Sequence, residues 1–209
     1  MAHDVESRLF LLLGGARSGK SAYGEALAAR LAGEAPITYI ATATASDDEM
    51  RKRIARHRAS RPPHWLTIEE PLNPAAALRA SATPVVLLDC VTLLVANLLL
   101  GGKPASDLSA ENTMKSEAEA RIDRAITDLL DAWRTHPTSL ILISNEVGMG
   151  LVPPYPLGRV YRDHLGRVNA RLAAEAAIVL LMVAGLPVEL KTLAAAWERE
   201  AKRRFSHEE

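Results

Sequence analysis

The chain has 209 residues, 48% of them apolar, which suits one domain with a sizeable hydrophobic core rather than a disordered protein. Lysine plus arginine and aspartate plus glutamate both number 25, so no net charge draws the whole protein to nucleic acid or to a membrane surface. The single cysteine excludes an intrachain disulfide, and the apolar run at residues 91–100 is too short to span a bilayer. We therefore expect a cytoplasmic protein with one domain, residues 1–209.

Apolar runs alternate with helical patterns along the chain. We predict strands at residues 9–13, 37–41, 85–88, 140–144 and 178–183, and a short edge strand at 186–190. We predict helices at residues 22–31, 47–60, 111–133, 160–176 and 193–204, a mobile loop at 101–109 and a frayed tail at 206–209. Several strands are nearly continuous Leu, Ile and Val, as strands buried on both faces are. This order predicts an α/β protein of three layers, with a mostly parallel sheet and helices on both faces.

The first predicted strand runs directly into a glycine-rich turn that fits G-x-x-x-x-G-K-[ST], the motif of a phosphate-binding loop. Glycines let consecutive backbone N–H groups curl around phosphate oxygens, and the N-terminus of the next helix adds partial positive charge. Lys20 would meet the β- and γ-phosphates, and the Ser21 hydroxyl would be a Mg²⁺ ligand. The motif predicts binding of a nucleoside triphosphate. The alternative explanation is a Gly/Ser turn that matches the motif by chance. Its residues are Gly14, Gly15, Ala16, Arg17, Ser18, Gly19, Lys20 and Ser21.

Small and hydroxyl-bearing residues follow the second predicted strand. Ligands of an open parallel sheet bind beyond the carboxyl ends of its strands, so Ala41, Thr42 and Ala43 could approach a nucleotide closely. An ordinary strand-to-helix connection explains these residues equally well.

The basic helix predicted after that strand contains His57. At helical spacing Arg53 and Arg61 would share its face if the helix extends that far. Neighbouring cations disfavour the protonated imidazole, and the neutral form is the one that can attack phosphorus while arginines hold the phosphates. The alternative at this point is a solvated basic face with a bystander histidine.

The third predicted strand ends in a carboxylate, Asp89. At that position in a P-loop protein, a carboxylate holds Mg²⁺ directly or through water. Capping of a following helix is the alternative role.

Two later segments face the same side of the predicted sheet. Residues 145–150, Asn-Glu-Val-Gly-Met-Gly, follow the fourth strand, and the next helix carries Arg159, Arg162, Arg167 and Arg171. A basic helix beside a nucleotide site could bind an anionic substrate, contact another subunit or remain solvated, and periodicity does not decide among these roles.

Together these segments resemble one family, from Leu9 to about Lys191. The family is the bifunctional adenosylcobinamide kinase/adenosylcobinamide-phosphate guanylyltransferase of cobalamin biosynthesis. The resemblance lies in the amino-acid sequences of residues 14–21, 39–42, 47–50, 145–150 and 167–169 and of the segment around His57.

This resemblance implies two reactions. ATP or GTP phosphorylates adenosylcobinamide, and GTP then donates GMP to adenosylcobinamide phosphate through a guanylylated histidine, giving adenosylcobinamide-GDP. His57 matches that histidine. Further implied nucleotide contacts are Arg58, Ala59, Ser60, Arg61, Glu69 and Asp89. The resemblance also implies a RecA-like P-loop fold and a homotrimer.

Two other functions fit the phosphate-binding loop. An ordinary P-loop kinase of a small molecule would use His57 only structurally and would form no protein-bound GMP. A regulatory or assembly module would bind nucleotide and change its oligomeric state without turnover.

Overall fold

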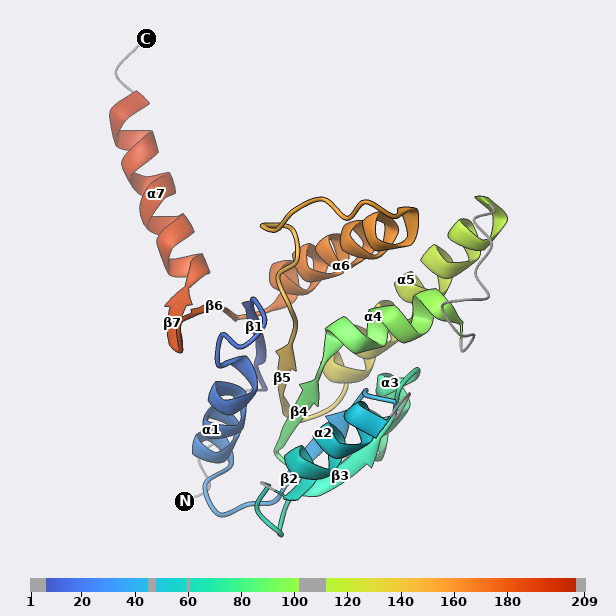
Figure 1. The fold of residues 1–209 in the computed structure, drawn as a ribbon. Coiled ribbons are helices and arrows are strands. Elements are labelled where there is room, and N and C mark those ends of the chain that lie inside the picture. Colours follow the sequence, from blue (N-terminus) through green and yellow to red (C-terminus); the bar gives the residue numbers. More distant parts are fainter. Residues whose placement is uncertain (1–6, 45–47, 60, 102–111, 206–209) are drawn as a thin grey trace.

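A seven-stranded sheet forms the middle layer of the protein (Figure 1). The computed structural model describes residues 7–44, 48–59, 61–101 and 112–205. The strand order is β3-β2-β4-β5-β1-β6-β7, and each neighbouring pair is parallel except β6 with β7. The strands are β1 (Leu9–Gly14), β2 (Ile37–Ala41), β3 (Leu66–Glu69), β4 (Val85–Asp89), β5 (Ser139–Ile143), β6 (Ile178–Val183) and β7 (Leu186–Glu189).

Helices cover both faces of the sheet, so the predicted three-layer α/β fold is confirmed. The helices are α1 (Lys20–Ala32), α2 (Asp48–Ala59), α3 (Pro74–Ala80), α4 (Val91–Leu100), α5 (Asn112–Arg134), α6 (Pro156–Glu175) and α7 (Leu190–Phe205). Apolar residues of α3, α4, α5 and α6 share one core cluster with the sheet, whereas α1 contributes to a second cluster on the opposite face. Helix α7 extends away from the sheet (Figure 1).

Strand β1 shows why a continuous apolar run suits the centre of this sheet. Successive side chains of a strand point to opposite faces. Leu9 and Leu11 therefore join the cluster under α3 to α6, whereas Phe10 and Leu12 join the cluster under α1. Both faces are covered, so none of these positions can be polar without cost.

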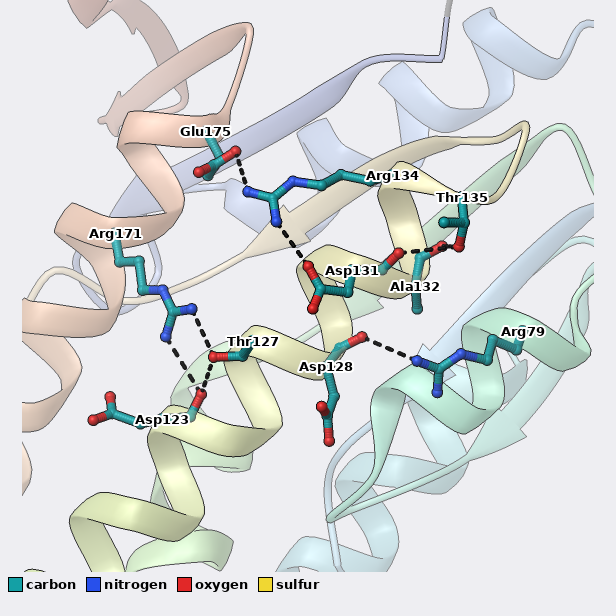
Figure 2. Close-up of polar contacts among 10 residues, drawn as sticks. All are labelled: Arg79, Asp123, Thr127, Asp128, Asp131, Ala132, Arg134, Thr135, Arg171 and Glu175. Carbon is teal, nitrogen blue, oxygen red and sulfur yellow. Dashed lines mark hydrogen bonds and ion pairs between the residues drawn. The ribbon is translucent and has the colours of Figure 1, made fainter.

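Polar contacts fix α5 against the helices on either side of it (Figure 2). From α6, Arg171 donates to the Asp123 carbonyl at 3.3 Å and to the Thr127 hydroxyl at 2.7 Å. Arg134, at the end of α5, pairs with Glu175 at 2.8 Å. From α3, Arg79 reaches the Asp128 carbonyl at 3.5 Å. This layer of helices is therefore held in register by hydrogen bonds as well as by its apolar core.

The strands predicted from sequence are all present; β2 and β6 have the predicted ends, and the ends of the others differ by at most one residue. Three elements were not predicted, namely β3, α3 and α4. Helix α6 begins at Pro156, four residues before its predicted start, because proline is well suited to a first helical turn. The predicted mobile loop beyond Gly101 and the predicted frayed tail lie outside the described residues.

Candidate nucleotide-binding site

The turn between β1 and α1 has a backbone that requires glycine at two points. Gly14 has φ +151° and Gly19 has φ +92°, in the region that favours glycine. A Cβ on Gly14 would lie 2.6 Å from the Met182 carbonyl oxygen and 2.7 Å from Ser18 Oγ. The glycines predicted from the motif are therefore demanded both by the shape of the loop and by its close packing on β6.

Lys20, the first residue of α1, is buried under this loop with 7% of its surface exposed. Its Nζ donates to the Gly15 carbonyl at 2.6 Å and to Ser18 Oγ at 3.3 Å. Burial lowers the pKa of Lys20, and the nearby Cys90 and Asp89 partly oppose that effect. The structure thus brings together the lysine of the loop and the carboxylate at the end of β4.

Thr42 joins the end of β2 to the end of β4. Its hydroxyl donates to the Cys90 carbonyl at 2.7 Å and accepts from the Cys90 amide at 2.8 Å. The Thr42 amide donates to the Asp89 carbonyl at 3.3 Å, and Asn97 Nδ2 donates to the Thr42 carbonyl at 2.9 Å. The Thr42 side chain is fully buried, so its hydroxyl stabilises the connection between the ends of β2 and β4. Its neighbours Ala41, buried, and Ala43, half-buried, flank that connection.

A buried tyrosine contacts the carboxylate of Asp89. Tyr39 Oη donates to Asp89 Oδ2 at 2.9 Å, and the guanidinium carbon of Arg61 lies 3.3 Å from the centre of the Tyr39 ring. Burial, and then the Asp89 carboxylate, raise the pKa of Tyr39, which keeps the phenol protonated. Sequence reasoning missed Tyr39, because an aromatic residue in a strand reads as an ordinary core residue.

Helix α2 carries His57 and ends at Ala59, so helical spacing does not continue to Arg61. The side chains of Arg53 and His57 and the whole of Ser60 lie outside the described part of the structure. Beside them, Arg58 pairs with Glu69, the last residue of β3, at 3.7 Å. Both side chains are more than half exposed, so this pair adds little stability. The structure nevertheless brings together two residues that the resemblance implies as GTP contacts.

The donor set around Lys20 suits Mg²⁺ bound together with a nucleotide. Ser21 lies in the first turn of α1, and Asp89 keeps Oδ1 outside the hydrogen bond from Tyr39. Within the part of the chain that the structure describes, His, Cys, Asp and Glu do not gather in groups of three that could hold a metal. Mg²⁺ in nucleotide enzymes needs no such group, because it takes one or two protein ligands and completes its shell with phosphates and water.

The segment after β5 packs beside the phosphate-binding loop. The Glu146 amide donates to the Gly14 carbonyl at 3.0 Å, and the Asn145 amide donates to Thr92 Oγ1 at 2.7 Å. Buried Asn169 of α6 accepts from Ser144 Oγ at 2.6 Å and donates to the Asn145 carbonyl at 3.0 Å. The residues at 145–150 and 167–169 that the resemblance singled out are therefore in direct contact.

The four arginines of α6 make contacts within the chain. Arg159 donates to the carbonyls of Pro153 and Pro154, and Arg162 donates to the Gly148 carbonyl. Arg167 pairs with Glu119 of α5 at 2.7 Å, and Arg171 makes the contacts in Figure 2. Through these hydrogen bonds and this ion pair, the four arginines hold α6 against the preceding loop and against α5.

A glycine-rich loop between β1 and α1, a buried lysine beneath it and a carboxylate at the end of β4, the parallel strand separated from β1 by β5, define a P-loop nucleotide-binding protein. Residues 10–190 match the family described as "Cobinamide kinase / cobinamide phosphate guanyltransferase". The chain belongs to this family, which confirms the predicted resemblance. It is therefore a transferase of adenosylcobalamin biosynthesis that combines cobinamide kinase and guanyltransferase activities.

Three curated proteins show the same relationship over nearly their whole length. The chain is 43% identical to the "Bifunctional adenosylcobalamin biosynthesis protein CobU" of Escherichia coli (strain K12), over 88% of this chain and 99% of that protein. The CobU protein of Salmonella typhimurium is also 43% identical, with the same coverage. The corresponding CobP protein of Pseudomonas aeruginosa is 46% identical, over 87% of this chain and 96% of that protein.

Among solved structures, the flagellar accessory protein FlaH from Methanocaldococcus jannaschii aligns with a TM-score of 0.39 and 16% identity, over 83% of this chain and 70% of that chain. No helix within residues 7–44, 48–59, 61–101 and 112–205 has the length and hydropathy to cross a membrane.

Proposed function

We propose that this protein phosphorylates adenosylcobinamide with ATP or GTP and then transfers GMP from GTP to adenosylcobinamide phosphate, giving adenosylcobinamide-GDP and pyrophosphate. The observation that carries the proposal is family membership together with a complete phosphate-binding loop, whose lysine, Lys20, is buried and donates to the Gly15 carbonyl within the loop. Residues 1–209 form one nucleotide-binding domain in this proposal, and the support is that all seven strands belong to a single sheet.

Each part of the loop has a role in this proposal. The amides of residues 15–21 surround the phosphates, and Lys20 neutralises the charge that develops on the transferred group. Ser21 and Asp89 would hold Mg²⁺, which supplies positive charge to the phosphate oxygens. Thr42, Ala41 and Ala43 line the nucleotide side of β2, and Arg58, Ala59, Ser60, Arg61 and Glu69 contact GTP.

The guanylyl transfer proceeds in two displacements at one phosphorus. A ring nitrogen of neutral His57 attacks the α-phosphorus of GTP, so that an N–P bond forms, the bond to the bridging oxygen breaks and pyrophosphate leaves. A phosphate oxygen of adenosylcobinamide phosphate then attacks the same phosphorus, the N–P bond breaks and the imidazole is regenerated. Support for His57 is its position on α2, close in sequence to Arg58 and Arg61, which contact Glu69 and Tyr39.

A labelling experiment tests this relay. The protein is incubated with GTP labelled at the α-phosphate and with Mg²⁺, and acid-labile label on the protein is measured. We expect full labelling of the wild type, none of His57→Asn, and unchanged labelling of His64→Asn, an exposed histidine seven residues away. Full labelling of His57→Asn removes His57 from the mechanism.

Adding adenosylcobinamide to the same incubation, and measuring its phosphorylation alongside the label on the protein, separates the other functions considered from the sequence. Phosphorylation of adenosylcobinamide without labelled protein indicates a P-loop kinase alone. Nucleotide binding without either product indicates a regulatory module.

We also propose that the protein is a cytoplasmic homotrimer that requires neither nucleic acid nor a membrane. The support is the family resemblance together with the balanced charge of the chain. Sedimentation equilibrium of the purified protein tests the trimer, and a concentration-independent monomer mass contradicts it.

A further inference from the structure

Tyr39 contacts both Asp89 and Arg61. It lies on β2, opposite Leu87 of β4, and 2% of its surface is exposed. Because alternate residues of a strand share a face, Tyr39 points to the same side of the sheet as Asp89, two residues beyond Leu87. The phenol therefore extends along the face of the sheet to the carboxylate at the end of β4, where its hydroxyl donates to Asp89 Oδ2 at 2.9 Å.

Arg61 is stacked on the face of the same ring. Its guanidinium carbon lies 3.3 Å from the ring centre, and Nη1 donates to Thr67 Oγ1 of β3 at 3.3 Å. A guanidinium on an aromatic face is attracted by the negative face of the ring and is held flat against it. Among the described residues, Arg61 Nε has no hydrogen-bond partner although it is buried, and the contacts that the structure shows for the guanidinium are the stack and the hydrogen bond to Thr67.

The alternation of charge explains why this arrangement is stable. A cation lies over the ring, the ring carries a hydroxyl donor, and that donor faces an anion, so each contact polarises the next in the favourable sense. One carboxylate oxygen of Asp89, Oδ2, accepts the hydrogen bond from the phenol, and Oδ1 lies outside that hydrogen bond. Without the phenol, the Asp89 carboxylate would lose the hydrogen bond that fixes Oδ2.

We infer that Tyr39 is a positioning residue that orients the Asp89 carboxylate through its hydroxyl and the Arg61 guanidinium through its ring. The inference rests on the proposed function, in which Asp89 holds the metal and Arg61 contacts the nucleotide. Tyr39 touches neither ligand itself. Residues that orient a metal ligand by a hydrogen bond change metal affinity by about 10- to 100-fold when they are lost.

Two substitutions separate the two halves of this inference. Tyr39→Phe removes only the hydroxyl and keeps the ring beneath Arg61. Tyr39→Leu removes both. Tyr23→Phe is the matched control, because Tyr23 lies on α1 against the same apolar cluster and its hydroxyl serves neither Asp89 nor Arg61 in the proposal.

Metal and nucleotide binding are measured separately on each folded protein. Mn²⁺ binding is followed by electron paramagnetic resonance in the presence of the α,β-methylene analogue of GTP, which cannot lose pyrophosphate. Binding of this analogue without metal is followed by calorimetry. Circular dichroism and a thermal melt report whether each variant is folded.

We expect Tyr39→Phe to weaken Mn²⁺ binding by about tenfold while analogue binding without metal stays within twofold of the wild type. Tyr39→Leu should weaken both Mn²⁺ binding and analogue binding without metal, since Arg61 also loses the ring against which it stacks. If Tyr39→Leu does not fold, Arg61→Lys tests the stack, because lysine keeps the charge but lacks the flat guanidinium. Tyr23→Phe should change neither value.

Asp89→Asn makes the outcomes distinguishable. If Asp89→Asn weakens Mn²⁺ binding and Tyr39→Phe does not, the orienting role of the hydroxyl is wrong while the proposed metal site stands. If Asp89→Asn has no effect, the proposed metal role of Asp89 fails, and the inference about the hydroxyl fails with it. Analogue binding that is unchanged in Tyr39→Leu and in Arg61→Lys overturns the role of the ring.

Discussion

The Gly185 amide donates a hydrogen bond to the Ser18 carbonyl at 3.1 Å and so joins the turn between β6 and β7 to the phosphate-binding loop. Contact is close, because a Cβ on Gly19 would lie 3.2 Å from the Gly185 Cα. Gly185 has φ +82°, and its neighbour Ala184 also has a positive φ, of 50°. The loop that should hold phosphates is therefore held by a hydrogen bond from a turn that lies 167 residues later in the chain (185 − 18).

Substitution of Gly185 should loosen that support. Gly185→Ala places a Cβ where the backbone has φ +82°, and the left-handed conformation costs an L-residue about 1–2 kcal/mol even though no atom obstructs the new methyl group. We expect urea denaturation to show a loss of about 1 kcal/mol, with weaker binding of GTP because the loop is less well held.

Ala184→Gly is the matched control for this effect. It relieves a positive φ at the adjacent position, so the free energy of unfolding should stay the same or rise slightly. Equal losses of stability in both variants would show that the conformation of this turn is not the cause.

Replacement of Lys20 by methionine should separate stability from function. Lys20→Met keeps an apolar stem in the buried site and removes the charge that burial disfavours. We expect kinase turnover to fall about 100-fold or more, since the phosphates lose their cation. The melting temperature at pH 7 should be equal to or higher than that of the wild type.

The pH dependence of that comparison follows from the lowered pKa of Lys20. Between the lowered native value and 10.5, the unfolded chain binds more protons than the native protein, so wild-type stability gains from rising pH. The advantage of Lys20→Met should therefore shrink as pH rises towards 10.5. An advantage that grows over this range contradicts the burial argument.

The fold was predictable where a local pattern determines it. The continuous apolar run at β1 and the glycine-rich turn at residues 14–19 need no tertiary information, because buried strands and phosphate-binding loops have characteristic sequences. The position of Asp89 at a strand end was predictable for the same reason, as the polar residue that closes a run of apolar ones. These features gave the correct three-layer class.

The missed elements lacked such a pattern. Strand β3 has four residues at the edge of the sheet, with exposed and half-buried positions. Helix α4 is apolar on nearly every side, so no helical period marks it, and α3 has only seven residues. The role of Tyr39 could not be predicted, because its partner Asp89 lies 50 residues away and meets it only through the pairing of β2 with β4.

Asn169 should contribute far more to stability than Arg167, two residues before it. Asn169→Ala leaves the buried Ser144 hydroxyl and the Asn145 carbonyl without their partner, and each unpaired group costs about 1–3 kcal/mol. We expect chemical denaturation to show a loss of about 2–4 kcal/mol.

Arg167→Ala is the comparison within the same short motif. Its ion pair with Glu119 joins side chains that are 67% and 42% exposed, and such surface pairs contribute about 0–1 kcal/mol. Comparable losses in the two variants contradict the distinction between the buried network and the surface pair.

The thiol of Cys90 should react slowly although it lies beside the nucleotide site. Burial, and then the Asp89 carboxylate, raise the pKa of Cys90 to about 11 from an ordinary value of 9.0. The thiolate is the reactive form, so at pH 8 iodoacetamide should alkylate the native, metal-free protein about a hundredfold more slowly than the urea-unfolded chain. The native rate should keep rising about tenfold per pH unit up to pH 10, because ionisation is completed only above 11. A native rate that levels off near pH 9 would show that the carboxylate and the buried surroundings do not hold this thiol neutral.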